Sequence, residues 1–310
     1  MLFGVWPGVI AADMVELTPL STPPEDVART RAALDLLHGD AKQFYIRCYR
    51  HYRGHGEPEP GVVAAPADPA NYAGHGRLMD LVACYRSTER DIAGYVEFVR
   101  QAVRDVASWG GGKVQVGEEL NVRAPQDGGF PGCFEAVSAG VTAGLEERTR
   151  LGVNVGIGVN CAGVADPGFW ATMVDTLGPD STAQLDFIGL DMFPDVFHPL
   201  PEHRVGEGAR FLVHTLRQVT RDAGISEETP IHVTETGWPT GPTRDETKQA
   251  RVLRTVAEAV AATGEVSVYE LFSLRDGISD GTWQNGFGLL HDDYTPKPSY
   301  DTVRRLIAAS

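Results

Sequence analysis

Short apolar runs alternate with amphipathic stretches along the whole chain. A short apolar run bounded by turn residues is typical of a buried strand, and an apolar stripe with a helical period is typical of a surface helix. The runs predict eight strands, near residues 2–5, 43–49, 78–85, 113–117, 152–159, 185–193, 230–235 and 266–273.

Amphipathic stretches predict helices after most of these strands, at residues 22–39, 89–110, 132–150, 166–178, 205–223, 244–264 and 297–309. Eight strands with intervening helices indicate an α/β fold, a single (β/α)8 TIM barrel over residues 1–310. An open sheet of six strands would leave two strands unused, and no G-x-G-x-x-G follows the first strand. Residues 50–77 are rich in Pro and Gly and have no helical period, so the second helix is expected to be short or missing.

The net charge of the chain argues against two classes of binding partner. A net charge of −15 argues against nucleic acid and against anionic membrane surfaces, because like charges repel. No apolar run is long enough to span a membrane, and the N-terminus lacks the pattern of a secretion signal. A cytoplasmic location is therefore expected, or secretion if a leader has been removed. The cysteines have no C-x-x-C spacing and are expected to be small buried hydrophobes (Cys48, Cys84, Cys133 and Cys161).

Candidate chemistry lies where the predicted strands end, because the active site of such a barrel is built at the carboxyl ends of its strands. Several carboxylates occur there, and burying them unpaired would cost several kcal/mol, which favours a functional reason for their presence. The candidates are Arg47 at the end of the second strand, Glu118, Glu119 and Asn121 at the end of the fourth, Asp191 and Phe193 at the end of the sixth, and Glu235 at the end of the seventh.

Two carboxylates facing each other across a barrel mouth suit glycoside hydrolysis. One donates a proton to the leaving oxygen, and the other attacks the anomeric carbon or activates water. Because both roles are then filled by side chains, neither a metal nor an organic cofactor is expected.

The chain resembles the clan A glycoside hydrolases in three segments. HVTETGWPT (232–240) is similar to the nucleophile segment of the plant-type β-1,3-glucanases, glycoside hydrolase family 17. VGEELN (116–121) is similar to the clan's Asn-Glu-Pro-Asn-type segment, and FGLLHDDYTPKPSYDTVRRL (287–306) resembles the common ending of such barrels.

This resemblance implies that Glu235 is the nucleophile and Glu119 the general acid/base, with net retention at the anomeric carbon. It implies that Arg47 keeps the nucleophile ionised by a charged hydrogen bond. Trp238 would either offer a face to a sugar ring or pack as a core residue beside Pro239. The expected substrate is a β-linked oligosaccharide or glycoside, and transglycosylation would use the same two carboxylates.

The chain departs from the clan's pattern at three places. Glu118 stands where the clan usually has an Asn that contacts the sugar 2-hydroxyl, and Phe193 stands where a Tyr often lies beside the nucleophile. The eighth strand lacks the usual Trp platform, and Trp283 in the following loop is the candidate replacement. If Glu118 enters the pocket, it would help to keep Glu119 protonated, because two close carboxylates resist sharing negative charge. Asp191 is equally consistent with a pocket contact and with a structural role at the strand end.

Two other classes of function stay open. A degenerate barrel could bind carbohydrate or act as a scaffold, which Glu118 and Phe193 support. A metal-dependent enzyme could use Glu118, Asp191 and histidines. The histidines of the irregular second loop are expected to be solvated rather than metal ligands (His51, His55 and His75).

Overall fold

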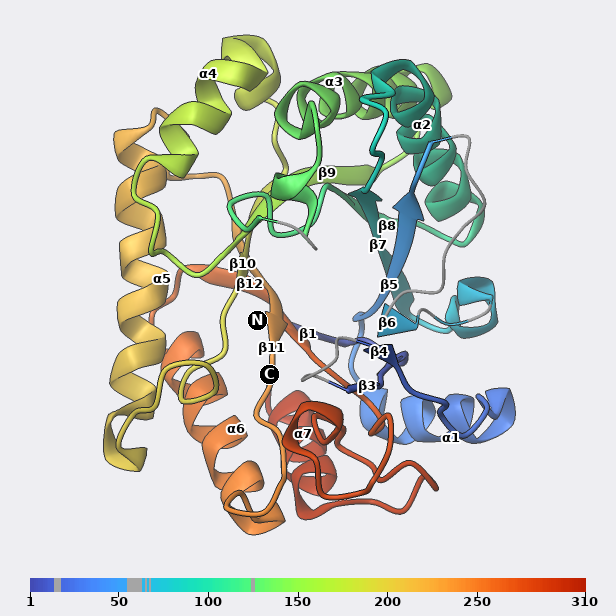
Figure 1. Cartoon of the computed structure of the whole chain (residues 1–310), viewed down its shortest axis with the longest axis vertical. Coiled ribbons are helices and arrows are strands. Elements are labelled where there is room, and N and C mark those ends of the chain that lie inside the picture. Colours follow the sequence, from blue (N-terminus) through green and yellow to red (C-terminus); the bar gives the residue numbers. More distant parts are fainter. Residues whose placement is uncertain (14–17, 55–62, 65, 67, 124–125) are drawn as a thin grey trace.

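The computed structural model describes residues 1–310 except 14–17, 55–62, 65, 67 and 124–125. Eight parallel strands close into a barrel in the order β1-β12-β11-β10-β9-β8-β7-β5 (Figure 1). The predicted TIM barrel is confirmed. The strands are β1 (Leu2–Val5), β5 (Phe44–Tyr52), β7 (Arg77–Tyr85), β8 (Gly112–Val116), β9 (Val155–Ala162), β10 (Phe187–Asp191), β11 (Ile231–Thr236) and β12 (Val266–Leu271).

The helices form an outer ring around the strands (Figure 1). Several begin at an aspartate whose side chain accepts a hydrogen bond from a backbone N–H of the first turn, as Asp26, Asp91 and Asp245 do. None of the helices in the described part of the chain is long and apolar enough to cross a membrane. They are α1 (Val27–His38), α2 (Ile92–Ser108), α3 (Cys133–Leu151), α4 (Phe169–Thr182), α5 (Val205–Asp222), α6 (Glu246–Ala261) and α7 (Pro298–Ala308).

The connection from β5 to β7 departs from the regular repeat, as expected from its Pro and Gly content. Its described residues hold a single 3-10 turn, η1 (Pro69–Tyr72), and the short strand β6 (Val63–Ala64) in place of an α-helix. β6 pairs with β2 (Val9–Ile10), and a second small antiparallel sheet joins β3 (Ala12–Asp13) to β4 (Thr18–Pro19). Two more 3-10 turns, η2 (Asp127–Gly129) and η4 (Trp283–Asn285), lie in loops after β8 and β12.

An apolar core fills the space between the strands and the helices. The cysteines all lie buried and unpaired, which confirms their prediction as small hydrophobes. The inside of the barrel also holds charged side chains: Lys113 Nζ lies 2.6 Å from Glu270 and 3.4 Å from Asp80. A Cβ at Gly4 would come within 2.7 Å of Tyr45 and 2.8 Å of Glu270, so this strand position has to be glycine to admit the two large side chains.

Candidate active site

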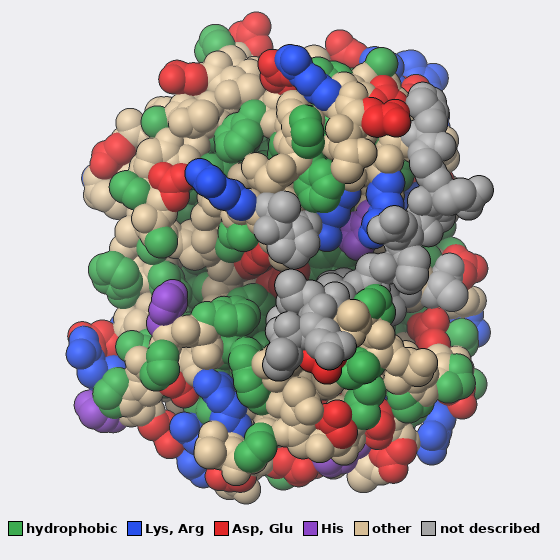
Figure 2. All heavy atoms as spheres, viewed as in Figure 1, with side chains coloured by type: hydrophobic (Ala, Val, Ile, Leu, Met, Phe, Trp, Pro, Cys, Tyr) green, Lys and Arg blue, Asp and Glu red, His purple; other side chains and the backbone are tan. Residues whose placement is uncertain are grey.

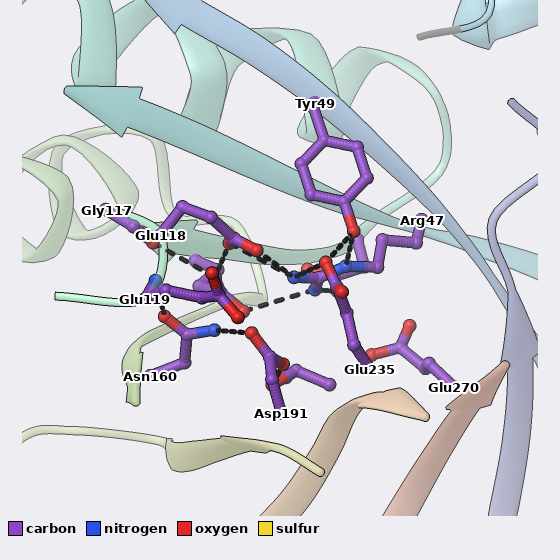
Figure 3. Close-up of polar contacts among 12 residues, drawn as sticks. Arg47, Tyr49, Gly117, Glu118, Glu119, Asn160, Asp191, Glu235 and Glu270 are labelled. Carbon is purple, nitrogen blue, oxygen red and sulfur yellow. Dashed lines mark hydrogen bonds and ion pairs between the residues drawn. The ribbon is translucent and has the colours of Figure 1, made fainter. Parts of the chain in front are cut away.

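A buried guanidinium lies at the centre of the barrel mouth, the end at which the strands have their carboxyl termini. Arg47 of β5 pairs with Asp80 at 2.6 Å. It also pairs with Glu118 at 3.2 Å and with Glu235 at 3.6 Å (Figure 3). Burial opposes its charge, but Tyr49 and the carboxylates raise the pKa of Arg47 well above its usual value. One permanent cation thus joins carboxylates from three parts of the barrel. It lies beside Glu235 as expected, although its shortest ion pair is to Asp80.

Tyr49 links Arg47 to Glu235. Its hydroxyl accepts a hydrogen bond from Arg47 Nε at 2.7 Å and donates one to Glu235 Oε1 (Figure 3). Burial, followed by the nearby carboxylates, raises the pKa of Tyr49 well above its usual value despite Arg47, so the hydroxyl keeps its proton. The sequence interpretation missed this residue. The signal was present, because Arg47, Tyr49 and His51 alternate along β5 and alternate strand residues share a face.

A local irregularity in β11 brings two consecutive residues to the site. The pairing of β10 with β11 shifts so that Leu190 lies opposite Val233 while Asp191 lies opposite Glu235. Such a bulge re-aims side chains. Thr234 Oγ1 donates to Asp191 Oδ1 at 2.6 Å, and Glu235 still lines the cavity at the mouth.

The turn after β8 directs both adjacent glutamates into the cavity. Glu119 has a φ of 45°, in the left-handed region, and therefore departs from the alternation of a strand. Asp127 Oδ2 accepts from the amide of Glu118 at 2.8 Å, and Asn160 Oδ1 accepts from the amide of Glu119 at 2.9 Å. Asp127 and Asn160 are further residues that the sequence interpretation missed, and Gly117, with a φ of 81°, begins the turn.

The two glutamates differ in their partners. Glu118 is buried and accepts hydrogen bonds from Arg47 and from Gln115 Nε2, whereas Glu119 is only partly buried. Burial and, after it, the charge of Glu235 raise the pKa of Glu119 to about 7. Burial raises the pKa of Glu118 well above its usual value even though Arg47 opposes the shift. Burial and Glu235 are the largest causes of the raised Glu119 pKa, and the contribution of Glu118 stays a prediction.

Asp191 has a structural set of partners as well as a place beside Glu235. Its carboxylate accepts from Asn160 Nδ2 and from Thr234 Oγ1, each at 2.6 Å. Burial first and the charge of Glu235 second raise its pKa well above the usual value. Gly189 makes this arrangement possible, because a Cβ there would come within 2.6 Å of Asn160 and 2.9 Å of Thr234.

A cavity of about 180 Å³ lies over Glu118, Glu119 and Glu235, and one of its walls is acidic while the other is aromatic. Figure 2 shows the hollow at this face, with acidic and hydrophobic side chains at its edge. One wall is aromatic, with Phe193 5.6 Å from Phe197 and 5.8 Å from Phe287 between ring centroids, and Phe197 at the rim is 63% exposed. The lining residues are Tyr49, His51, Arg86, Glu118, Glu119, Gln126, Phe193, Phe197, Glu235, Phe272 and Phe287.

A larger cavity of about 520 Å³ lies elsewhere, between the loops that follow β11 and β12. Arg244, Glu246, Asp276 and His291 are among its lining residues, and the candidate catalytic carboxylates are not. We therefore place the candidate active site in the smaller cavity.

Asn121 and Trp283 were expected to contact substrate, but the structure gives both other partners. Asn121 donates to the carbonyl of Ala162 and accepts from its amide, both at 2.8 Å, and so joins the turn after β8 to the end of β9. The ring of Trp283 lies 6.3 Å from those of Phe197 and Phe287, so it supports the aromatic wall without being one of its described lining residues.

Trp238 follows the core alternative. It is completely buried, and its indole Nε1 donates to Asp195 Oδ2 at 3.1 Å. The Arg244 guanidinium lies 4.7 Å from its ring centroid. A buried ring covered by a cation has no face for a sugar.

Three of the carboxylates could in principle hold a metal ion, since oxygens of Glu118, Asp191 and Glu235 lie within 4.8 Å of one another. The protein's own donors already bind these groups, so a cation would have to share or displace those donors. Burial lowers the pKa of His51, which lines the cavity, to about 4. His75 is exposed, and His55 lies outside the described residues.

Solved structures with a similar fold are glycoside hydrolases. A β-glucuronidase from Ruminococcus gnavus in complex with D-glucuronic acid is 14% identical, with a TM-score of 0.64, and the match covers 99% of this chain and 48% of that one. A β-glucosidase is 16% identical, with a TM-score of 0.60 and coverage of 92% and 88%. A GH5_18 variant from Streptomyces cattleya in complex with Manb1-4GlcNAc is 14% identical, with a TM-score of 0.62 and coverage of 91% and 75%.

At these identities the similarity shows the fold alone, and the chain spans about half the length of the glucuronidase that it matches. No protein-family model matches the sequence, and a search of curated proteins finds no match. The chain thus has a (β/α)8 barrel, and the cavity at the carboxyl ends of its strands is lined by Glu118, Glu119 and Glu235, with Arg47 paired to Glu235 beneath it.

Proposed function

We propose that this protein is a retaining glycoside hydrolase that cleaves a β-glycosidic bond, with Glu119 as general acid/base and Glu235 as nucleophile. The observation that carries the proposal is the contrast between two carboxylates in one cavity. The pKa of Glu119 is raised to about 7. Glu235 instead accepts a hydrogen bond from Tyr49 and forms an ion pair with Arg47, and such partners favour an ionised carboxylate. Two carboxylates in such different environments are typical of a general acid and a nucleophile.

The reaction would proceed in two displacements. Glu235 attacks the anomeric carbon while Glu119 donates its proton to the departing oxygen, which forms a covalent glycosyl-enzyme. Glu119 then removes a proton from a water molecule, which attacks the same carbon and releases Glu235. Two inversions give net retention.

The cavity suggests a neutral sugar. Its aromatic wall suits the apolar face of a pyranose ring, and the carboxylates opposite can accept hydrogen bonds from hydroxyls. Arg86 also lines the cavity but is paired with Asp127 at 3.0 Å. A uronate would meet several carboxylates and few free cations among the described residues, so we propose a neutral β-linked oligosaccharide or glycoside. The motif resemblance to family 17 makes β-1,3-glucans a natural first choice.

A panel of aryl β-glycosides and β-glucans, assayed with wild type and with Glu235→Ala, tests the proposal. Wild type should release the aryl group and Glu235→Ala should not, although azide should restore some turnover by standing in for the nucleophile. Proton NMR should show the β-anomer as the first product. If the α-anomer forms first, the enzyme is inverting and the double displacement is wrong.

The same panel separates the other functions. A carbohydrate-binding or scaffold protein would show saturable binding without release of the aryl group. A metal-dependent enzyme would lose activity in EDTA and regain it with added divalent cation, whereas we expect activity to survive EDTA.

A further inference from the structure

We propose that Tyr49 is the positioning residue of the nucleophile and that it makes Oε2 of Glu235 the attacking atom. This inference rests on the proposed function, and its test is arranged so that the two can fail separately. Tyr49 comes from β5, on the side of the cavity where the sequence interpretation had placed only Arg47.

The polar contacts of Glu235 involve only one of its two carboxylate oxygens in the described part of the chain. Among the described residues, both the hydrogen bond from Tyr49 and the ion pair with Arg47 at 3.6 Å go to Oε1. The Glu235 side chain is 11% exposed and lines the cavity, so its remaining access is toward the space that a sugar would fill. A carboxylate held by one oxygen presents the other to the anomeric carbon.

The direction of the Tyr49 proton follows from its own contacts. A tyrosine hydroxyl has one proton, and here its oxygen accepts the N–H of Arg47 Nε at 2.7 Å, so the proton must point to Glu235. The ring cannot easily turn away. It packs edge-on against Trp6 with 5.5 Å between centroids, and the Arg47 guanidinium lies 4.9 Å from its own centroid.

Among the described lining residues of the cavity, Tyr49 is the one that donates a hydrogen bond to Glu235. Phe193 faces the cavity from the loop after β10, but its ring has no donor, and Tyr49 carries the sole hydroxyl among the described lining residues. Arg47 divides its donors among Tyr49, Asp80, Gln115 and Glu118. The hydrogen bond to the nucleophile is therefore that of Tyr49.

Tyr49→Phe removes one oxygen atom and tests the proposal. It should lower kcat/KM for aryl β-glycosides roughly ten- to hundredfold, the value of a hydrogen bond to a charged group, with little change in KM. It should also move the acidic limb of the pH profile to higher pH, because a carboxylate that loses a donor is protonated more easily. The carboxyl groups around Glu235 are kept in this variant (Glu118, Glu119 and Asp191), and Arg47 keeps its guanidinium but loses Tyr49 as the acceptor of its Nε–H.

Tyr85→Phe is the matched control. Tyr85 is also fully buried on a barrel strand, but its hydroxyl donates to the carbonyl of Pro131 at 3.0 Å. Its loss should leave both kcat/KM and the acidic limb unchanged. If Tyr49→Phe does not fold, as shown by its melting curve, 3-fluorotyrosine at position 49 keeps the hydroxyl, makes it a stronger donor and should move the acidic limb to lower pH.

A 2-deoxy-2-fluoro glycoside that traps the glycosyl-enzyme tests the nucleophile and the role of Tyr49 separately. Peptide mass spectrometry should find the label on Glu235, and labelling should be slower in Tyr49→Phe by a factor similar to the loss in kcat/KM. A label on another residue overturns the proposed function. A label on Glu235 with wild-type rates and an unmoved acidic limb in Tyr49→Phe overturns the role of Tyr49 alone.

Discussion

Glu118 and Glu119 are consecutive in the chain, yet both carboxylates face one cavity. On a regular strand neighbouring side chains point to opposite faces, but Glu119 has a φ of 45° and the strand has already ended at Val116. The two glutamates have different partners, which gives them different roles. Glu118 is held by Arg47 and Gln115 as part of the wall, and the less buried Glu119 is left to meet a substrate.

Loss of Glu119 should affect substrates according to their leaving group. Glu119→Ala should slow glycosides with poor leaving groups roughly 10²–10⁴-fold, because the departing oxygen then leaves without a proton. Activated nitrophenyl glycosides should lose much less in the first step. A plot of log kcat/KM against leaving-group pKa should become steeper in the variant, and equal losses across the series would argue against Glu119 as the acid.

The alkaline limb of the pH profile of kcat/KM should follow the loss of the proton from Glu119. Burial and the charge of Glu235 raise its pKa to about 7, and the protonated form is the active one, so kcat/KM should fall as the pH rises through about 7. Glu235→Gln removes one of the two causes. Carboxyl ¹³C NMR of that inactive variant should therefore show Glu119 titrating at lower pH than in wild type. An unchanged titration would mean that Glu235 does not influence Glu119.

Glu118→Gln should change substrate preference more than the pH profile. The larger causes of the raised Glu119 pKa are burial and Glu235, so the alkaline limb should stay nearly in place. The variant offers an amide N–H donor in place of the carboxyl group, which should favour simple β-glucosides over longer substrates. A large downward move of the alkaline limb would instead show that Glu118 keeps Glu119 protonated.

The exposed rim of the aromatic wall should contribute to binding and not to stability. Phe197 is 63% exposed, so Phe197→Ala should leave the melting temperature almost unchanged but raise KM several-fold, the loss of roughly 1 kcal/mol of apolar contact. Phe211→Ala is the matched control, since Phe211 on α5 is 64% exposed and is not among the lining residues of the cavity. The same KM in both variants would exclude a substrate contact at Phe197.

Stability should decline from mildly acidic to mildly alkaline pH. Burial first and Asp80 second raise the pKa of Glu270 to about 8, well above its value of 4.5 in the unfolded chain. Between these values the folded state holds a proton that the unfolded state has released. The free energy of unfolding therefore falls as pH rises, by up to about 1.4 kcal/mol per pH unit for one group.

Chemical denaturation at several pH values measures this slope. Burial raises the pKa of Asp127 to about 6 and that of Glu119 to about 7, and it raises the pKa values of Glu118 and Asp191 well above the usual range, so Glu270 should supply one part of the slope between pH 7 and 8. Glu270→Gln should flatten the curve there, while Glu258→Gln, at an exposed position of α6, should not. A curve for Glu270→Gln as steep as that of wild type would contradict the assignment.

Much of the barrel could be predicted from the sequence because its signals are local. The apolar runs and helical stripes are set by neighbours a few positions apart, and the predicted strand at 266–273, for example, is β12 at Val266–Leu271. Polar residues after apolar runs also predicted that Arg47, Glu119, Asp191 and Glu235 would meet, since parallel strands in a barrel end together. The alternation along β5 contained Tyr49 as well, although it was not used.

The roles of the side chains depended on contacts between distant segments. Whether Glu118 enters the cavity is decided by Asp127 and Asn160, which hold the turn after β8, and no strand pattern contains that information. Trp238 has the same local context whether it faces a sugar or the core, and only its burial against Arg244 decides.

The sequence by itself thus determined the order of strands and helices and the positions at which chemistry could occur, because periodicity and turn residues act over a few positions. The tertiary structure decided which carboxylate is bound by Arg47, which one lies partly exposed in the cavity and which one has a raised pKa. Those properties depend on burial and on charges brought together from β5, β8, β10 and β11, and they arise only when the barrel closes.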